Sequence, residues 1–167
     1  TGPIYDLLIE AEESKWDNIR RYKGVDYSWR MIKTARNSFP AGTFEVQDAR
    51  QLKELAETWD CVLLMHCLDH LDNYQAAIKE AVRVSKRFIC ICLWRSFIQE
   101  GTNLNDRNMF GKEEGEEPWE DTHLQDYSKE TLIKEFNKYG LEDVDFCDTE
   151  DCNDPGRFNT VWILKKP

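Results

Sequence analysis

Polar side chains follow the predicted strands at the points where those strands end. Asp26, Asp48 and His66 each come after a strand-like segment, and a fourth such segment runs into Trp94 and Arg95. A carboxylate at a strand end can accept two hydrogen bonds from a ribose diol, and a second carboxylate can accept one from an exocyclic amine. Asp26 and Asp48 together therefore suggest an adenosine site, although each alone also fits a strand-ending turn or a helix cap.

The six cysteines are the other residues whose side chains could take part in chemistry. Cys61, Cys90 and Cys92 lie in apolar runs, where a small thiol packs as a hydrophobic residue, and the spacings include no CxxC pair. We interpret them as reduced core residues of a cytoplasmic protein without a metal site. Cys90 and Cys92 would share one face of a strand, so a metal or redox pair is the alternative interpretation.

The elements that must position these side chains alternate between strand and helix. Apolar periodicity switches repeatedly between the two repeats, which is typical of an α/β layer architecture. Asp60–Met65 and Arg87–Trp94 are continuous apolar runs, as expected for strands buried on both faces. The remaining strands are predicted at Tyr22–Asp26 and Thr43–Gln47, with an antiparallel pair at Leu141–Cys147 and Phe158–Leu164.

Capping residues mark the helices. A first helix is predicted at residues 3–13, and a second begins after Ser28 and ends before Pro40. Asp72 or Asn73 opens a third, and Ser128 opens a fourth that Gly140 terminates. The third helix buries one face, made of Tyr74, Ala77, Ile78, Ala81 and Val82.

Composition excludes several classes of protein. The chain has 167 residues and a net charge of −10, which fits one globular domain, residues 1–167. No apolar run is long enough to span a membrane, and no basic segment precedes an apolar stretch as in a signal peptide. Lys and Arg do not cluster, so we expect no nucleic-acid binding.

Three longer segments make the sequence similar to a known family. Gly24–Arg36, Phe44–Ala49 and Asp60–Leu71 resemble the class I S-adenosylmethionine-dependent methyltransferases of the small, metal-independent kind. The resemblance extends through Lys79–Ser85 and Tyr127–Gly140 to the last strand. It implies a three-layer, Rossmann-like sheet, mostly parallel, with an antiparallel pair of strands at its C-terminal end.

The resemblance implies S-adenosylmethionine as the cofactor and assigns roles to individual residues. Asp26 matches the acid that holds the ribose hydroxyls, and Tyr27 and Met31 match positions that flank the adenine. Asp48 matches the acceptor of the adenine amine, and Ala49 would contact the ring through its backbone. Met31 on a helix is also compatible with a role as core filler.

Fewer residues of this sequence match the family's contacts to the methionine end of the cofactor. His66 and Cys67 lie where the family's fourth strand opens toward it. Thr1 and Gly2 resemble the last residues of the family's glycine-rich loop, whose leading glycines and preceding strand are absent from this sequence. In the family that strand would lie between Tyr22–Asp26 and Asp60–Met65. We therefore expect weak cofactor binding, and a gap filled by another copy of the chain, by collapse of the two strands, or by upstream residues.

Residues 95–127 form a long irregular connection with three of the eight glycines, and residues 100–122 are predicted to be its least ordered part. If the resemblance holds, this insertion is a lid that shapes the pocket of a small-molecule acceptor. His123 is its only evident base, although the sequence favours a loop histidine in water over that role. The candidate pocket residues are Trp94, Arg95, Trp119, His123 and Tyr127.

The expected reaction is transfer of a methyl group to an unidentified acceptor. Because the sulfonium charge already activates the methyl group, the protein mainly orients the reactants, and a dedicated catalytic residue is not required. A cofactor-binding or scaffolding domain without turnover is the alternative. A nicotinamide-dependent oxidoreductase would also use Asp26, but the sequence lacks Gly-x-Gly-x-x-Gly.

Overall fold

The computed structural model describes residues 21–93, 128–150 and 158–167. The predicted helix at 3–13 and the insertion at 95–127 lie outside these ranges. The described residues fall into two compact units, which divide between Glu54 and Leu55.

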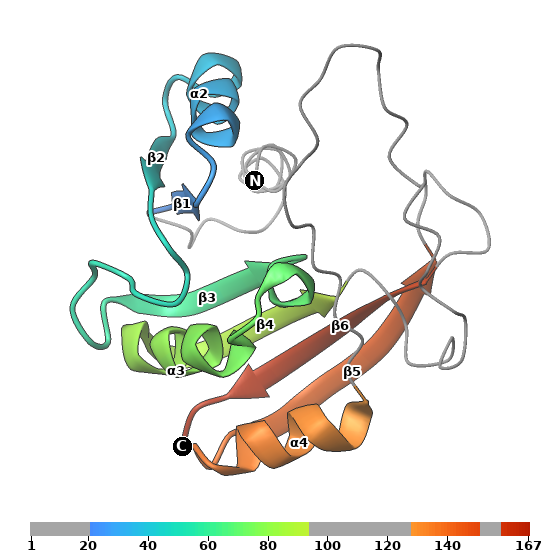
Figure 1. Ribbon diagram of the computed structural model, residues 1–167. Helices are drawn as coiled ribbons and strands as arrows, with labels where there is room; N and C mark the ends of the chain where they lie inside the picture. Colours follow the sequence, from blue (N-terminus) through green and yellow to red (C-terminus); the bar gives the residue numbers. More distant parts are fainter. Residues whose placement is uncertain (1–20, 94–127, 151–157) are drawn as a thin grey trace, which may run out of the picture. The chain divides into compact units, whose positions relative to one another are not determined.

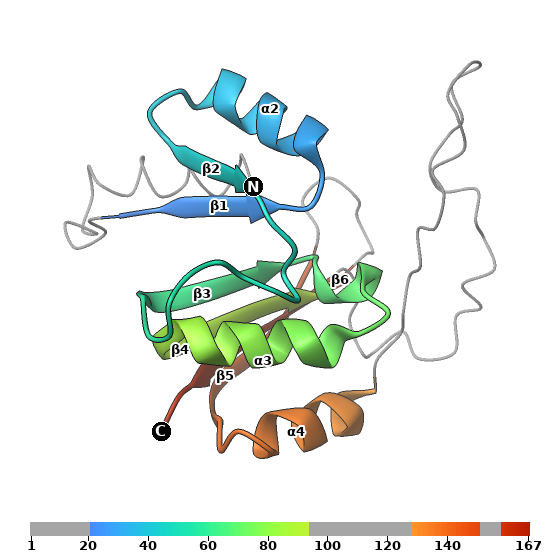
Figure 2. The ribbon, with the colours of Figure 1, turned by 60° about the vertical axis from the view of Figure 1, so that its left-hand side comes forward.

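The first unit is a β-α-β element (Figure 2). Strand β1 (Lys23–Asp26) pairs in parallel with β2 (Thr43–Val46), and helix α2 (Trp29–Ser38) connects them. Ser28 caps α2, because its side chain accepts a hydrogen bond from the Met31 amide, and the helix ends before Pro40, as predicted. The core of the unit is formed by Ile32, Ala35 and Phe44, with Tyr22 and Phe39 packed against them.

The second unit contains a four-stranded mixed sheet in the order β3-β4-β6-β5 (Figure 1). Strands β3 (Trp59–Met65) and β4 (Ser85–Leu93) are parallel. Strand β6 (Phe158–Lys165) lies antiparallel between β4 and β5 (Glu142–Glu150), so β5 forms an edge. The predicted parallel pairing is confirmed within each of the two sheets, as is the antiparallel C-terminal pair.

Helix boundaries in the second unit follow the predicted caps. Asn73, rather than Asp72, caps α3 (Tyr74–Val84), and Ser128 caps α4 (Lys129–Asn137). A short 3-10 helix, η1 (Leu68–His70), precedes α3, and Gly140 follows α4 with the left-handed φ of +62°. Val84 is fully buried on α3, whereas the predicted core residue Val82 is half-buried. No helix in the described ranges has the length and apolarity needed to cross a bilayer.

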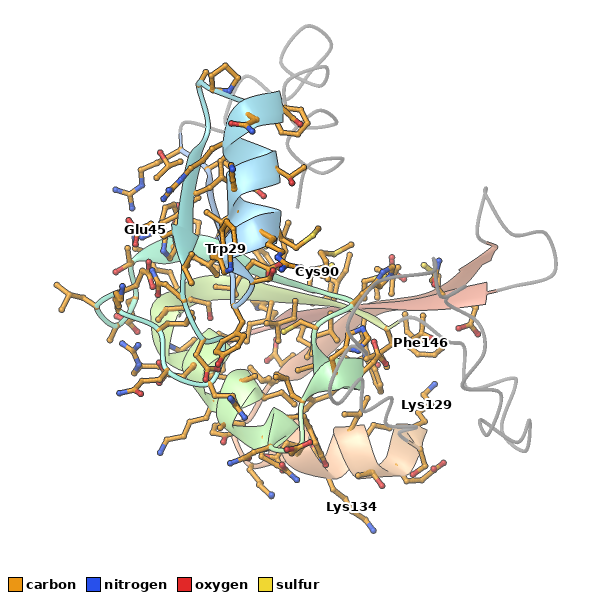
Figure 3. The ribbon with its side chains drawn as sticks, turned by 45° about the horizontal axis from the view of Figure 1, so that its top comes forward. Trp29, Glu45, Cys90, Lys129, Lys134 and Phe146 are labelled. Atoms are coloured by element: carbon orange, nitrogen blue, oxygen red, sulfur yellow. The ribbon has the colours of Figure 1, made fainter. Side chains whose placement is uncertain are left out.

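Helices α3 and α4 cover the same face of the four-stranded sheet (Figures 1 and 2). Trp162 of β6 lies on this face and is 1% exposed. Its ring packs edge-on against Phe136 of α4 and Phe146 of β5, with centroids 5.0 Å apart in both cases. Lys129 of α4 lies with its ammonium 3.8 Å from the Phe146 ring centroid, and Figure 3 labels both partners. This aromatic cluster joins α4 to the sheet.

Strand β3 departs from the prediction that Asp60–Met65 is buried on both faces. It is a terminal strand of the four-stranded sheet, and no strand in the described ranges pairs with its outer edge. Cys61, Leu63 and Met65 share one exposed face, with Leu63 39% and Met65 38% exposed, whereas Leu64 on the other face is buried. The predicted core position of Cys61 is wrong for the same reason, because burial requires a neighbouring element that this face lacks among the described residues.

The aromatic cluster gives a direct test of the second unit. Trp162→Ala should lower the free energy of unfolding by about 3–5 kcal/mol, because it removes a fully buried ring and leaves a cavity between α4 and the sheet. Ile163→Ala is the matched control on the same strand, since Ile163 is half-buried on the opposite face and should cost less. Urea denaturation followed by far-UV circular dichroism measures both. Equal losses for the two variants would contradict this packing.

Candidate functional site

The carboxyl ends of β1 and β2 bring Asp26 and Asp48 to one edge of the first unit. Asp26 is in register with Val46, and the backbone amide of Gln47 donates a hydrogen bond to the backbone carbonyl of Asp26 over 3.0 Å. The loop that follows β2 therefore begins beside the point where β1 ends. Ala49 lies half-buried in this loop. In parallel sheets with helical crossovers, this edge is where ligands bind.

The Asp26 carboxylate is half-buried and only partly engaged. Its Oδ1 accepts a hydrogen bond from the Ser28 amide over 2.8 Å, which forms a tight turn before α2. Within the described ranges, no hydrogen bond reaches Oδ2. The turn-forming and ligand-binding interpretations of this residue are therefore compatible, because one oxygen serves the turn and the other can accept from a diol.

The Asp48 carboxylate is engaged at both oxygens by Arg50. Oδ1 accepts from the Arg50 amide at 2.8 Å and from Nε at 3.0 Å, and Oδ2 accepts from a terminal nitrogen of the guanidinium at 2.9 Å. The hydrogen bonds from the Arg50 side chain hold the pKa of Asp48 below its ordinary value. For Asp48 to accept a hydrogen bond from an amine, as predicted, part of this contact must be exchanged.

Large side chains at the start of α2 are exposed. Tyr27 is 77% exposed, Trp29 61% and Met31 47%. The interpretation of Met31 as core filler is therefore wrong, since it lies on the outer side of α2 while Ile32 enters the core. Tyr27 and Met31 are both available for contact with a flat apolar ligand such as a base.

A buried polar cluster anchors the loop that carries Asp48. Gln47 is 4% exposed, and its Nε2 donates to Glu45 and Glu54, each over 3.0 Å, while its Oε1 accepts from the Lys53 amide. Lys23 of β1 lies between the two carboxylates, with Nζ 2.7 Å from Glu54 and 2.9 Å from Glu45. Partial burial opposes the charge of Lys23, but the hydrogen bonds that its ammonium donates to Glu54 and Glu45 raise its pKa. The loop is thus tied to the sheet through charge-assisted hydrogen bonds.

The second unit places His66 and Cys67 directly after β3. The His66 amide donates to the Cys92 carbonyl over 2.8 Å, which extends the pairing of β3 with β4 by one residue. The His66 ring approaches the same residue, with Nε2 3.2 Å from the Cys92 Sγ. Cys67 is half-buried, and its carbonyl accepts from the His70 amide at the start of η1. Both predicted residues therefore lie at the carboxyl end of a parallel strand.

Seven predicted residues lie outside the described ranges. They are Thr1, Gly2, Trp94, Arg95, Trp119, His123 and Tyr127. Their roles stay predictions. In the described ranges, no three His, Cys, Asp or Glu side chains come together in a way that could hold a metal ion.

Residues 10–88 match the family described as "Methyltransferase domain". Comparison with curated proteins gives no match. Among solved structures, the chain is similar to magnesium protoporphyrin IX methyltransferase from Synechocystis PCC 6803 with bound S-adenosylmethionine, at 13% identity and a TM-score of 0.63. That similarity covers 88% of this chain and 60% of the Synechocystis chain. A S-adenosylmethionine-dependent methyltransferase from Methanosarcina mazei is 17% identical, with a TM-score of 0.63 over 86% of this chain and 81% of that chain.

The chain has the class I methyltransferase fold. The resemblance found in the sequence is thereby confirmed. The chain is also similar to the [4+2]-cyclase SpnF, at 16% identity and a TM-score of 0.66, over 99% of this chain and 70% of that one. The same fold is thus found in a protein named for a different reaction, and the fold alone does not identify the reaction of this chain.

Sequence reasoning missed three residues of this methyltransferase fold that the structure places beside the predicted ones. Arg50 pairs with Asp48, and its spacing of two residues after an aspartate is a signal that could have revealed it. Trp29 is exposed beside Tyr27, at the first position of α2. Cys92 lies against His66, and only the register of β3 with β4 could have shown this.

The contacts of Lys23, Gln47 and the two glutamates should stabilise the loop that carries Asp48. Lys23→Met removes the cation that compensates Glu54, whose side chain is 8% exposed, and should lower the free energy of unfolding by about 1–3 kcal/mol. The Lys53 amide should also exchange its hydrogen faster. Lys33→Met, at an exposed position of α2, is the control and should cost less than about 0.5 kcal/mol. Unchanged exchange at Lys53 in the Lys23 variant would show that the cluster does not hold the loop.

Proposed function

We propose that this chain binds S-adenosylmethionine and is part of an enzyme that transfers its methyl group to a small-molecule acceptor. The observation that carries the proposal is the state of Asp26. One of its carboxylate oxygens serves its own turn, and no hydrogen bond within the described ranges occupies the other. This acid lies at the end of a parallel strand, inside the segment that matches the methyltransferase domain family.

The residues of the first unit fit the adenosine part of the cofactor. Asp26 would accept hydrogen bonds from the ribose hydroxyls, and the exposed Tyr27 and Met31 would flank the adenine ring. Asp48 would accept from the adenine amine after partial exchange of its contact with Arg50, with the Ala49 backbone beside the ring. His66 and Cys67 would contribute to the methionine end.

When bound, S-adenosylmethionine supplies a methyl group activated by the positive charge on its sulfur. The residues of this chain hold the adenosine part and fix its orientation, which is the main contribution that such a transfer needs. The predicted lid at 95–127 would exclude water and shape the acceptor pocket, with His123 as its candidate base.

A cofactor-binding or scaffolding domain without turnover is the second candidate. The observation that favours it is the bidentate contact of Arg50 with Asp48, which occupies the predicted amine acceptor. Measurement of methyl transfer to small-molecule acceptors, alongside cofactor binding, separates the two candidates. Binding without transfer to any acceptor would favour the scaffold.

We also propose that a further strand completes the sheet at the outer edge of β3. The observation that supports this is that β3 is terminal in its sheet, with no strand of the described ranges at its outer edge. Backbone N–H and C=O groups along a strand edge normally find partners, so this edge favours pairing with another strand. The strand could come from upstream residues or from another copy of the chain.

Replacement of Asp26 tests the cofactor site. Asp26→Asn keeps an oxygen for the Ser28 amide but removes the charge, so α2 should fold while affinity for S-adenosylmethionine falls by about 1.5–3 kcal/mol. The measurement is a titration in a chain that binds the cofactor. Asp60→Asn, an exposed carboxylate at the start of β3, serves as the control. Unchanged affinity in the Asp26 variant would remove this residue from the site.

Hydrogen exchange tests the proposed strand beside β3. The His66 amide points to β4, so by alternation the amides of Leu63 and Met65 point to the outer edge. In a longer chain that carries an upstream strand and a Gly-x-Gly loop, these two amides should exchange much more slowly than in the 167-residue chain. The Leu64 amide faces β4 and should change little. Equal rates for Leu63 and Met65 in both chains would contradict the pairing.

A further inference from the structure

Asp26 and Asp48 form the same hydrogen bond in the turns that follow the two parallel strands of the first unit. In each case the carboxylate Oδ1 accepts from the backbone amide two residues later over 2.8 Å, from Ser28 in the first turn and from Arg50 in the second. The two turns therefore share their local backbone contact. They differ in the side chain at the third position, which is a serine in one turn and an arginine in the other.

The Arg50 side chain returns to the carboxylate of its own turn and fills it. Nε lies 3.0 Å from Oδ1 of Asp48 and 3.1 Å from Oδ2, and a terminal nitrogen of the guanidinium lies 2.9 Å from Oδ2. Together with the backbone amide of Arg50, these contacts match the roughly four lone-pair sites that a carboxylate offers. A further donor to Asp48 must therefore displace a contact of the guanidinium.

Other contacts hold the loop that carries this pair. Gln47 anchors the loop through a buried amide group, which accepts from the Lys53 amide and donates to two glutamates. The Gln51 amide donates to the Asp48 carbonyl over 2.9 Å. The side chains of Asp48 and Arg50 are 31% and 38% exposed, and an ion pair this exposed contributes little to stability. The loop should therefore keep its conformation without the guanidinium.

Without the guanidinium, Asp48 would have one engaged oxygen and one open oxygen. The backbone amide of residue 50 would still bond to Oδ1, whereas Oδ2 would accept from an incoming donor without any exchange. Asp26 already has this arrangement. The guanidinium therefore adds a competitor for Asp48 that the turn itself does not need.

We propose that Arg50 is a specificity-determining residue, which competes with the exocyclic amine of adenine for Asp48. Binding of adenine exchanges a guanidinium contact for an amine contact, so the site gains less from the amine than an open carboxylate would give. Arg50 thereby lowers the preference of the site for adenine over a purine that lacks the amine. The inference rests on the proposed function, because it takes Asp48 to face the adenine.

Titration with adenosine and with purine riboside tests this competition. Purine riboside is adenosine without the exocyclic amine, and both ligands are uncharged, so the sulfonium charge and the methionine end do not affect the comparison. Arg50→Gln should tighten adenosine binding by about twofold to fivefold, the range for one exposed charged contact. It should not tighten binding of purine riboside. Chemical-shift titration of the backbone amides by NMR measures both affinities.

Lys53→Gln is the matched control, because it removes the same positive charge from an exposed position in the same loop. It should leave the preference for adenosine over purine riboside unchanged. Asp48→Asn completes a double-mutant cycle, since Arg50→Gln should give no gain for adenosine in the Asp48→Asn background. The cycle isolates the coupling between these two side chains from every other contact of Arg50. Equal gains in both backgrounds, or equal tightening of both ligands, would overturn the inference.

The Asp26 variant separates this inference from the proposed function. If Asp26→Asn weakens adenosine binding but Arg50→Gln leaves it unchanged, only this inference fails. If Arg50→Gln selectively tightens adenosine while Asp26→Asn has no effect, only the proposed role of Asp26 fails. Absence of adenosine binding in both the wild-type and the Arg50→Gln proteins would overturn the two together.

Discussion

Backbone pairing on both edges of β4 is the constraint on which the second unit depends. β4 bonds in parallel to β3 on one side and antiparallel to β6 on the other, and its residues Ile89 and Ile91 are fully buried. The same pairing continues past the end of β3 and fixes His66 over Cys92. A polar candidate residue is thus positioned by the sheet itself rather than by a loop, which restricts its movement.

In the first unit, the comparable constraint is electrostatic. β1 and β2 are only four residues long, and a cluster of Lys23, Gln47 and two glutamates reinforces their pairing. The two aspartates at their ends then differ in availability. One carboxylate oxygen of Asp26 accepts a hydrogen bond within its own turn, whereas Arg50 donates to both oxygens of Asp48. The proposed contact of Asp26 with a ribose would therefore leave its turn in place, whereas the proposed contact of Asp48 with an amine would require exchange of the bonds from Arg50.

Local signals in the sequence predicted local structure well. The caps Ser28, Asn73 and Ser128 and the left-handed Gly140 stand where the pattern placed them, because capping depends only on neighbouring residues. Burial of Asp60–Met65 on both faces was not predictable in this way, since it depends on which elements pack beside β3. The contact of His66 with Cys92 depends on strand register, which joins residues 26 positions apart. The positions of Asp26, Asp48 and His66 at strand ends were therefore predictable, but their partners were not.

We propose that the acid at the end of β1 belongs to a site for S-adenosylmethionine and not for a nicotinamide dinucleotide. Parallel calorimetric titrations with S-adenosylmethionine and with NAD test it most directly, in a chain that includes the strand proposed beside β3. We expect saturable heat with S-adenosylmethionine, with one site per chain, and none with NAD. Saturable binding of NAD without binding of S-adenosylmethionine would contradict it.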